Sequence, residues 1–313
     1  MGRVCYLNGQ FIPESELKIS AYDLSVAQGV AAFEMTRSFN GKHFKLYEHI
    51  GRLEDSCRLL NIPWPWDGQF IHQNIEKITE MNDHGPGEEH RLLIVVSPGA
   101  APIYKEIEGT INHPFVYIAD FPLRYTVAGF SKYFTEGVHC VTSPIQQVPD
   151  ACVPSAAKHR SRLHFHLAQQ QAPTGTWPLL QDDQGHYTEA PGANICFVTG
   201  GNVYQITPNA LPGISMQTIY DDLRLQVFPG SWGGHDLHTV DELWLTGTPF
   251  CMLPVVSLDG KPIGDGKPGP VYQDTLAKWS KLVGVDIAQQ IYDWDHPATL
   301  WTPDAQRTHT AQH

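Results

Sequence analysis

Long apolar runs and a basic leader are both absent from this sequence. No apolar run approaches the ~20 residues that a membrane-spanning helix needs. The first residues, MGRVCYLNGQFIPESEL, lack a basic segment followed by an apolar one, so we expect no cleaved signal peptide. These absences predict a cytoplasmic protein that does not act in a membrane.

Paired cysteines and regular metal-ligand spacings are also missing. The six cysteines are scattered and form no C-x-x-C pair, which indicates reduced thiols in a cytoplasm rather than a disulfide framework. Among the sixteen histidines, His164 and His166 are two residues apart and would lie on different faces of a helix. Because the fixed spacings of metal sites are absent, the sequence predicts no metal site.

Positive charge is scarce. The formal net charge is −12 and the isoelectric point is near 5.7, and no basic cluster stands out, so we expect no nucleic-acid partner. The chain has 313 residues, of which 42% are hydrophobic and 17% charged. This length and composition predict a globular protein of two domains.

The first 122 residues predict a small α/β domain. Asn-Gly turns at 8–9 and 40–41 indicate hairpins. Apolar residues from Leu46 to Leu60 recur at helical spacing, and a second helix is expected over 67–83. Buried strands are expected over 91–99 and 114–121.

The pattern breaks into Arg, Tyr, Gly and Ser over 123–131, which predicts an interdomain loop. A larger domain is expected over 132–292, and the polar tail at 293–313 is expected to be flexible. In the larger domain we expect strands at 138–148, 176–183, 195–206 and 242–248, and helices at 159–172, 215–227 and 269–284.

Three features of the larger domain carry chemistry. Lys158, in SAAKHRSRL, has an amine that can form an imine with a carbonyl cofactor. Glu189, in YTEAPGANICFV, has a carboxylate that can keep a pyridine nitrogen protonated, and the turn LPGIS at 211–215 can bind phosphate through backbone N–H groups. Taken singly, each could be an ordinary surface residue or helix end. Together they match the three groups by which a protein can hold pyridoxal 5′-phosphate (PLP): its carbonyl, its pyridine nitrogen and its phosphate.

These motifs occur in an order that resembles one enzyme family. FEMTRSFNGKHFKLYEHIGRL, the Lys158 segment, LLQDDQGHYTEAPGANICFV, LPGIS and DELWLTGTPFCMLPVVSLDGKPIGDGKPGPV follow one another along the chain. The sequence is similar to the fold-type IV PLP enzymes, the class IV aminotransferase family, over residues 4–285. The resemblance implies a mixed α/β (α+β) fold with a small α/β domain, a larger pseudo-barrel domain and the cofactor between them.

The resemblance also implies roles for individual residues. Lys158 would form the internal aldimine with PLP and then move the proton during catalysis. Glu189 would pair with the pyridine nitrogen, and Arg52 in HIGRL would grip the phosphate with its forked donors. From its helical pattern alone, Arg52 could be a surface arginine, but its position in the motif favours the phosphate-binding role. Further cofactor contacts implied by position are the phosphate ligands Gly213, Ile214, Ser215, Gly247 and Thr248, and Asn194 in support of Glu189.

The substrate side departs from each subfamily of this family. Leu163 stands where branched-chain aminotransferases carry a tyrosine, and KHRSRL resembles the lysine segment of aminodeoxychorismate lyases instead. Met35, however, replaces the threonine expected of a lyase. Phe33 belongs to the F-E pair typical of aminotransferases and is expected to line the pocket.

Recognition of a substrate carboxylate is unusual as well. Glu89 and Arg91 fall where the branched-chain type has a tyrosine and an arginine. Arg91 could bind a carboxylate or merely cap a strand edge. Pro249 follows Thr248 and has no N–H to donate, which removes one expected donor. The positions of the D-amino-acid subfamily hold Ile103 and Lys105, so that pocket is not matched either.

The sequence therefore predicts a PLP-dependent aminotransferase, branched-chain aminotransferase-like, that acts on an amino acid and a keto acid by a ping-pong mechanism through Lys158. The alternatives are an aminodeoxychorismate lyase, which eliminates pyruvate, and a D-amino-acid or (R)-amine transaminase. A non-enzymatic PLP-binding scaffold is a further alternative. The resemblance implies a homodimer whose loops close each pocket, with Tyr104, Tyr125 and Phe130 on candidate loops.

Overall fold

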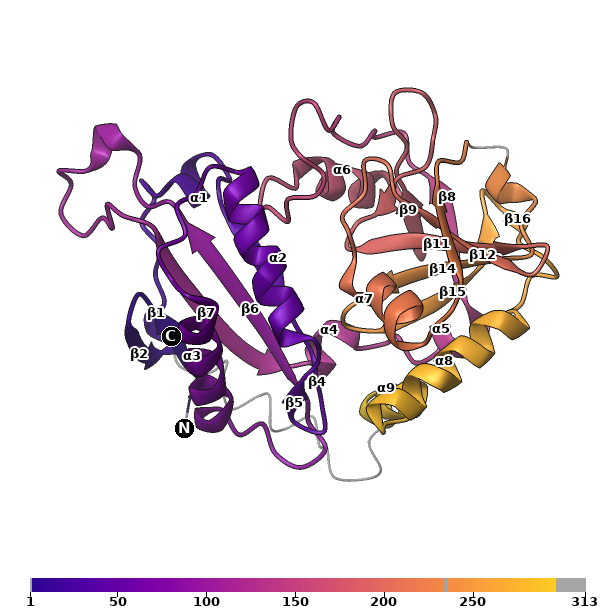
Figure 1. Cartoon of the computed structure of the whole chain (residues 1–313), viewed down its shortest axis with the longest axis horizontal. Helices are drawn as coiled ribbons and strands as arrows, with labels where there is room; N and C mark the ends of the chain where they lie inside the picture. The colour runs from indigo at the N-terminus through magenta and orange to yellow at the C-terminus, as the bar shows by residue number, and fades with distance from the viewer. Residues whose placement is uncertain (1, 234–235, 297–313) are drawn as a thin grey trace.

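Two sheets lie side by side in this structure, a computed structural model that describes residues 2–233 and 236–296 (Figure 1). A five-stranded sheet has the order β2-β1-β7-β6-β3, a nine-stranded sheet is built around the path β13-β12-β11-β14-β15-β8-β9, and β4 pairs with β5 alone. Within the described ranges no helix is long and apolar enough to span a membrane.

The strands are β1 (Val4–Leu7), β2 (Gln10–Pro13), β3 (Ala32–Met35), β4 (Ser38–Phe39), β5 (Lys42–His43), β6 (His90–Ser97), β7 (Phe115–Pro122), β8 (Val138–Thr142), β9 (Thr176–Leu179), β10 (Glu189–Ala190), β11 (Ala193–Thr199), β12 (Asn202–Ile206), β13 (Val227–Gly230), β14 (Glu242–Gly247), β15 (Cys251–Leu258) and β16 (Lys261–Pro262). The α-helices are α1 (Leu24–Ala27), α2 (Leu46–Leu59), α3 (Gly68–Met81), α4 (Arg124–Val127), α5 (Tyr133–Glu136), α6 (Leu163–Gln171), α7 (Ile214–Gln217), α8 (Pro270–Val283) and α9 (Ile287–Asp295). Single turns are η1 (Glu14–Glu16), η2 (Pro102–Tyr104) and η4 (Asp236–His238), and η3 (Thr218–Asp222) is a π-helix.

Helices α2 and α3 cover one face of the five-stranded sheet. Their apolar residues, spaced three and four apart, pack against the buried residues of β6 and β7. Asp67 caps α3 by accepting the N–H of Phe70 at 2.6 Å. The opposite face of the sheet carries a smaller apolar cluster around Phe33 and Val95. That face is the one available for a site.

Strand β3 is the edge of the five-stranded sheet, and successive side chains along it point to opposite faces. Glu34 contacts α2, whereas Phe33 and Met35 lie on the other face. The edge does not stay unpaired, because the chain around Lys158 pairs with it through the bridge between Ala32 and His159.

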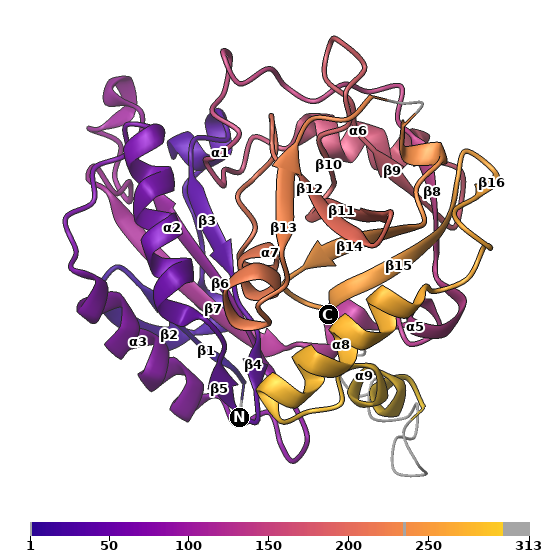
Figure 2. The ribbon, with the colours of Figure 1, turned by 45° about the vertical axis from the view of Figure 1, so that its right-hand side comes forward.

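The larger sheet closes on itself through β10. This strand pairs with β11, and on its other side the N–H of Leu180 donates to the carbonyl of Glu189 at 3.0 Å. The N–H of Thr188 donates to the carbonyl of Leu180 at the same distance. The chain just after β9 is thereby joined to β10, which gives the curled shape in Figure 2. Glu189 lies on the strand that closes the curl.

Several segments differ from their sequence-based expectations. The helix expected over 159–172 begins only at Leu163, and the strand expected over 138–148 ends at Thr142. The helix predicted over 215–227 ends at Asp222, and β13 begins at Val227. The segment 123–131 contains the helical turn α4 rather than loop alone. The tail was expected to begin at 293, but α9 continues to Asp295, whose carboxylate accepts the N–H groups of Gly129 and Ser131. Residues 297–313 lie outside the described residues.

Candidate active site

Lys158 is fixed between the two sheets by its backbone. The N–H of Phe33 on β3 donates to its carbonyl at 2.9 Å, and its own N–H donates to the hydroxyl of Ser56 on α2 at 3.0 Å. The Nζ atom lies 4.9 Å from the centre of the Phe33 ring. The backbone of Lys158 is therefore bonded to the edge strand of the five-stranded sheet, although its segment lies between β8 and β9 of the nine-stranded sheet.

The environment of Lys158 favours a neutral amine. Burial lowers its pKa to about 7, and the positive charge of Arg52 acts in the same direction. The carboxylates of Glu34 and Glu189 oppose that shift. A lysine with a pKa near 7 is a nucleophile and a proton acceptor at neutral pH.

Glu189 is buried on β10 and held by one side chain. Gln147 donates its amide to Oε1 at 2.8 Å. Burial raises the pKa of the carboxyl to about 7, against the opposing effects of Lys158 and Arg162. A cationic or N–H-donating group placed next to Glu189 would stabilise its charged form.

The guanidinium of Arg52 is held by the buried carboxylate of Glu34. Glu34 on β3 accepts Nε at 2.6 Å and Nη2 at 3.0 Å, and His49 approaches the same carboxylate at 2.8 Å. Burial alone would raise the pKa of Glu34, but Arg52 and His49 hold it well below its usual range. Nη1 of Arg52 donates to the carbonyl of Pro212 at 2.8 Å. The guanidinium is thereby oriented toward the turn at 211–215.

That turn is set by Asn194 and Gly213. Asn194 lies opposite Glu189 in the β10–β11 hairpin, and its amide donates to the carbonyl of Leu211 at 2.7 Å. A Cβ on Gly213 would lie only 1.9 Å from Oδ1 of Asn194, so no other residue fits there without a shift. The side chain of Asn194 thus bonds the turn, whereas the side chain that donates to Glu189 is that of Gln147.

These groups surround a first cavity. Thr246 contributes a buried hydroxyl that has no hydrogen-bond partner among the described residues. Such an orphaned donor, next to Thr248, fits a ligand that brings its own acceptor oxygens. The predicted cofactor residues in the lining are Arg52, Lys158, Glu189, Asn194, Gly213, Ile214, Ser215, Gly247 and Thr248.

A second cavity of about 560 Å³ adjoins the first. Both are lined by Lys158, Arg162, Gly192 and Thr248, so the lysine lies where they meet. Its volume is within the range of sites for small organic ligands. The predicted pocket residues in the second cavity are Phe33, Met35, Arg91 and Pro249.

Arg91 lies in the second cavity as a buried cation. Burial lowers its pKa to about 9, and the neighbouring Arg37 acts in the same direction. Its Nη1 reaches the carbonyl of Thr36 at 3.3 Å, Nε has no hydrogen-bond partner in the described part of the chain, and no described carboxylate forms an ion pair with it. The strand-edge alternative does not account for a buried guanidinium beside a cavity, whereas an anionic ligand would.

The rest of the second cavity is aromatic with a cationic rim. Phe130, Trp177 and Phe250 contact one another with ring centroids 5.7 to 6.0 Å apart. Arg160 and Arg162, which also line this cavity, lie over the Phe33 ring, at 4.8 and 5.5 Å from its centre. The cavity therefore offers an apolar wall and positive charge together.

Some predicted residues lie elsewhere. Leu163 begins α6, is 67% exposed and lines neither cavity, so the structure does not place it in the pocket. Glu89 is buried, but its carboxylate accepts the N–H groups of Asn40 and Gly41 and a hydroxyl hydrogen from Ser38. Ile103 is 81% exposed on the loop before β7.

Sequence reasoning did not single out several lining or supporting residues. Arg160 and Arg162 lie two and four residues after Lys158, and that alternation of positive charge was the available signal. Gln147, Ser56 and Thr246 come from distant segments and carried no local pattern.

The comparisons with known proteins point to one family. The family model Amino-transferase class IV matches residues 31–258. The chain is 28% identical over 295 residues to branched-chain-amino-acid aminotransferase-like protein 1 of Arabidopsis thaliana, covering 89% of this chain and 50% of that one. It is 25% identical over 291 residues to the D-alanine aminotransferase of Bacillus licheniformis, covering 91% and 98%. Proteins named for branched-chain substrates and for D-alanine are thus both similar to it.

Solved structures show the same fold. The branched-chain aminotransferase of Thermoproteus uzoniensis with norvaline superposes with a TM-score of 0.79 at 22% identity, covering 94% of this chain and 98% of that one. The branched-chain amino acid aminotransferase of Thermobaculum terrenum in its PLP form gives 0.77 at 20% identity, covering 94% and 97%. The predicted mixed α/β fold of fold-type IV is confirmed.

Proposed function

The chain belongs to the class IV aminotransferases, and we propose that it uses PLP to transfer the amino group of an apolar amino acid to a keto acid. The observation that carries this proposal is the position of Lys158. Its amine lies where a cavity suited to a phosphorylated pyridine meets a cavity suited to a carboxylate with an apolar side chain.

The first cavity fits PLP group by group. Arg52, the 213–215 turn, Thr248 and the orphaned hydroxyl of Thr246 suit a phosphate. Glu189, whose pKa is raised toward 7 by burial, suits a protonated pyridine nitrogen. Lys158 lies in the lining of the same cavity and suits the carbonyl carbon.

When bound, PLP supplies an electron-withdrawing ring that stabilises negative charge on the substrate's α-carbon. Glu189 would keep the ring nitrogen paired with a negative charge. Lys158 accepts a proton at Nζ and returns it, a role that its lowered pKa favours near neutral pH. Because the same site takes the donor and then the acceptor, we expect ping-pong kinetics.

The second cavity supports an amino acid rather than a simple amine. Arg91 is a buried cation that lacks an anionic partner among the described residues, and a substrate carboxylate would supply one. The aromatic residues Phe130, Trp177 and Phe250 favour an apolar side chain. A branched-chain amino acid has both features, so the preference is consistent with the branched-chain relatives.

A half-reaction screen tests this function. PLP-loaded protein is mixed singly with L-leucine, L-glutamate, D-alanine and an (R)-amine, and conversion of the cofactor to pyridoxamine phosphate is followed by absorbance. We expect conversion with L-leucine. Conversion by D-alanine alone or by the amine alone would contradict the proposed substrate class.

The lyase alternative has its own readout. Release of pyruvate from aminodeoxychorismate, with the cofactor unchanged, would contradict the transaminase proposal. Borohydride reduction followed by peptide mass spectrometry should place a phosphopyridoxyl group on Lys158. A modified lysine elsewhere would contradict the assignment of Lys158, whatever the substrate.

We also propose that the protein is a homodimer, as the resemblance to this family implies. Large apolar side chains such as Ile103 and Tyr125 are exposed and are candidates for an interface. Light scattering behind size-exclusion chromatography should give twice the 35.0 kDa chain mass. A monomeric mass would contradict this assembly.

A further inference from the structure

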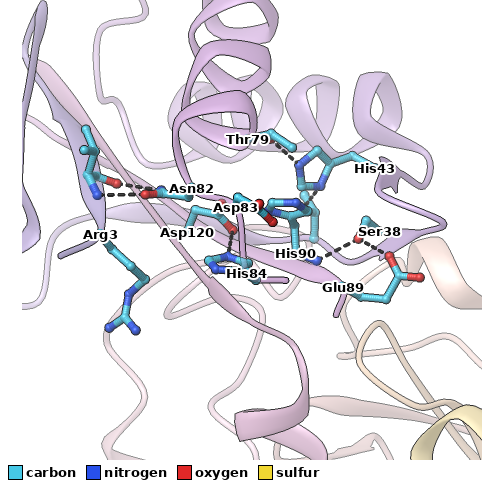
Figure 3. Close-up of polar contacts among 12 residues, drawn as sticks. Arg3, Ser38, His43, Thr79, Asn82, Asp83, His84, Glu89, His90 and Asp120 are labelled. Carbon is cyan, nitrogen blue, oxygen red and sulfur yellow. Dashed lines mark hydrogen bonds and ion pairs between the residues drawn. The ribbon is translucent and has the colours of Figure 1, made fainter. Parts of the chain in front are cut away.

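A cluster of two histidines and an aspartate lies in the small half of the molecule, away from both cavities. Nε2 of His84 is 3.2 Å from Oδ1 of Asp120, and Nδ1 of His90 is 2.8 Å from Oδ2 of the same carboxylate. The three ligand atoms lie within 4.8 Å of one another. In Figure 3 both imidazole rings lie beside the Asp120 carboxylate.

Two atoms of this cluster are buried without a hydrogen bond. The side chain of His84 is 5% exposed and that of Asp120 is fully buried. Yet neither Nε2 of His84 nor Oδ1 of Asp120 has a hydrogen-bond partner among the described residues, although they lie at ion-pair distance. The carboxylate of Asp120 thus contacts two imidazole nitrogens in a buried place, and its charge there needs a proton or a metal ion on those nitrogens.

The fold holds the three residues in place by separate contacts. Asn82, at the end of α3, clamps β1 by bonding the N–H and the carbonyl of Val4, which fixes the chain just before His84. The N–H of His90 donates to the hydroxyl of Ser38 at 2.7 Å. Asp120 is on β7, which pairs with the strand that His90 begins. The site therefore joins a loop and two strands.

We propose that His84, His90 and Asp120 bind a divalent transition-metal ion of the zinc type, as a structural site. Two nitrogens and one carboxylate oxygen form a donor set that zinc uses, with water completing four ligands. Ligand atoms of a tetrahedral zinc site lie about 3.4 Å apart, which the spacings of 2.8 and 3.2 Å approach.

Among the described residues, the polar groups around the cluster are already paired with other residues, so only the three residues themselves are left to hold a cation. Neither ring nitrogen of His43, which contacts the His90 ring, is available for a metal, because Thr36 and Thr79 occupy both. Glu88 is near His84 but is paired with Arg124 at 3.0 Å. His90 is 12% exposed and gives an ion access from solvent.

Bound metal would tie down the loop that reaches the larger half. The carbonyl of Gly87 accepts Nε1 of Trp294 at 3.1 Å, and Glu89 accepts the amide of Gln290 at 3.1 Å, so this loop contacts α9. His84 and His90 lie at its two ends. We therefore expect the metal to stabilise the fold without entering the reaction.

The test uses chelator-treated, PLP-loaded protein titrated with Zn²⁺ in competition with a chromogenic chelator, and with Co²⁺ followed by visible absorption. We expect one tight zinc per chain, a rise in melting temperature on zinc addition, and the intense spectrum of four-coordinate cobalt. His84→Gln should weaken zinc binding more than about 100-fold, because loss of even an outer partner costs about 10–100-fold.

The matched control is His72→Gln, which removes a half-buried histidine of α3 that contacts Glu76 and stacks on Tyr47, outside the cluster. It should bind zinc as the wild type does, and Cys152→Ala, which removes the exposed thiol, should do the same. Equal zinc affinity in His84→Gln and the wild type would overturn the proposal, and so would a wild type without tight zinc. Since the chelator assay does not depend on turnover, the result is independent of the proposed transamination.

Discussion

The two cavities that meet at Lys158 balance their charges differently. In the first, the charged residues predicted to hold the cofactor have partners of opposite charge: Glu34 holds Arg52, and the charges of Glu189 and Lys158 oppose each other's pKa shifts. In the second, Arg91 is buried with no described ion-pair partner. The comparison teaches that one cavity is preorganised by the chain itself, while the other keeps a charge free for an incoming ligand.

The largest effect is expected for a change at Lys158, which lines both cavities. Lys158→Ala should lower kcat of the half-reaction at least about 10³-fold, because it removes both the cofactor-linking amine and the proton carrier. Stopped-flow absorbance with L-leucine measures this. Lys278→Ala, at an exposed ion pair with Asp274, is the matched control and should react at the wild-type rate.

A change confined to the second cavity should separate substrate binding from cofactor binding. Arg91→Met should lower kcat/KM for L-leucine about 100-fold, since the carboxylate loses a buried cation. PLP affinity should stay the same, and the melting temperature should rise because an unpaired buried charge is removed. Unchanged kcat/KM would show that the arginine is structural. Arg58→Met, in an exposed pair with Asp55, controls for the loss of charge.

A change confined to the first cavity should weaken cofactor binding and leave substrate binding unchanged. We expect this effect to be smaller than that of Arg91→Met. Thr246→Val removes the orphaned hydroxyl and should weaken PLP binding about tenfold, the value of one hydrogen bond to a charged group. The apparent KM for L-leucine should not change. Fluorescence titration of cofactor-free protein gives the affinity. Tighter or equal PLP binding would show that the hydroxyl does not face the phosphate.

The pH dependence of the reaction with PLP tests the lowered pKa of Lys158. Burial lowers the pKa of Lys158 to about 7, so its amine is neutral above that pH and protonated below it. The rate at which cofactor-free protein reacts with PLP should therefore fall as pH drops below about 7. In Glu189→Gln the midpoint should move lower, because the Glu189 charge holds that pKa up. A wild-type midpoint near 10 would contradict the desolvated site.

The smallest expected effect concerns a residue that lies outside both cavities. Leu163→Ser should change kcat/KM less than about twofold and stability by no more than about 0.5 kcal/mol, as is usual for an exposed position. Steady-state kinetics and thermal melting measure both. A large loss of activity would mean that Leu163 closes the site in an assembly with a second copy.

Local sequence patterns were enough to predict those features that depend on one segment of the chain. The apolar spacing of α2 was visible from Leu46 onward, and the F-E pair of the family resemblance predicted that Phe33 would line the pocket, where the structure places it. The family motifs marked Lys158, Glu189 and Arg52, and the structure brings all three into one cavity. In contrast, the helix predicted over 215–227 stopped early, because Leu223 ends the π-helix and the following residues pair with β12.

By itself the sequence determined the cofactor chemistry and the fold class, because those depend on short motifs in a fixed order. Only the tertiary structure decided what surrounds them. It turned Asn194 toward the turn at 211–215, exposed Leu163, left Arg91 without an ion-pair partner among the described residues, and brought His84 and His90 to Asp120 across a strand pair. Burial and contacts between distant segments control these outcomes, and neither has a period or spacing that can be read along the chain.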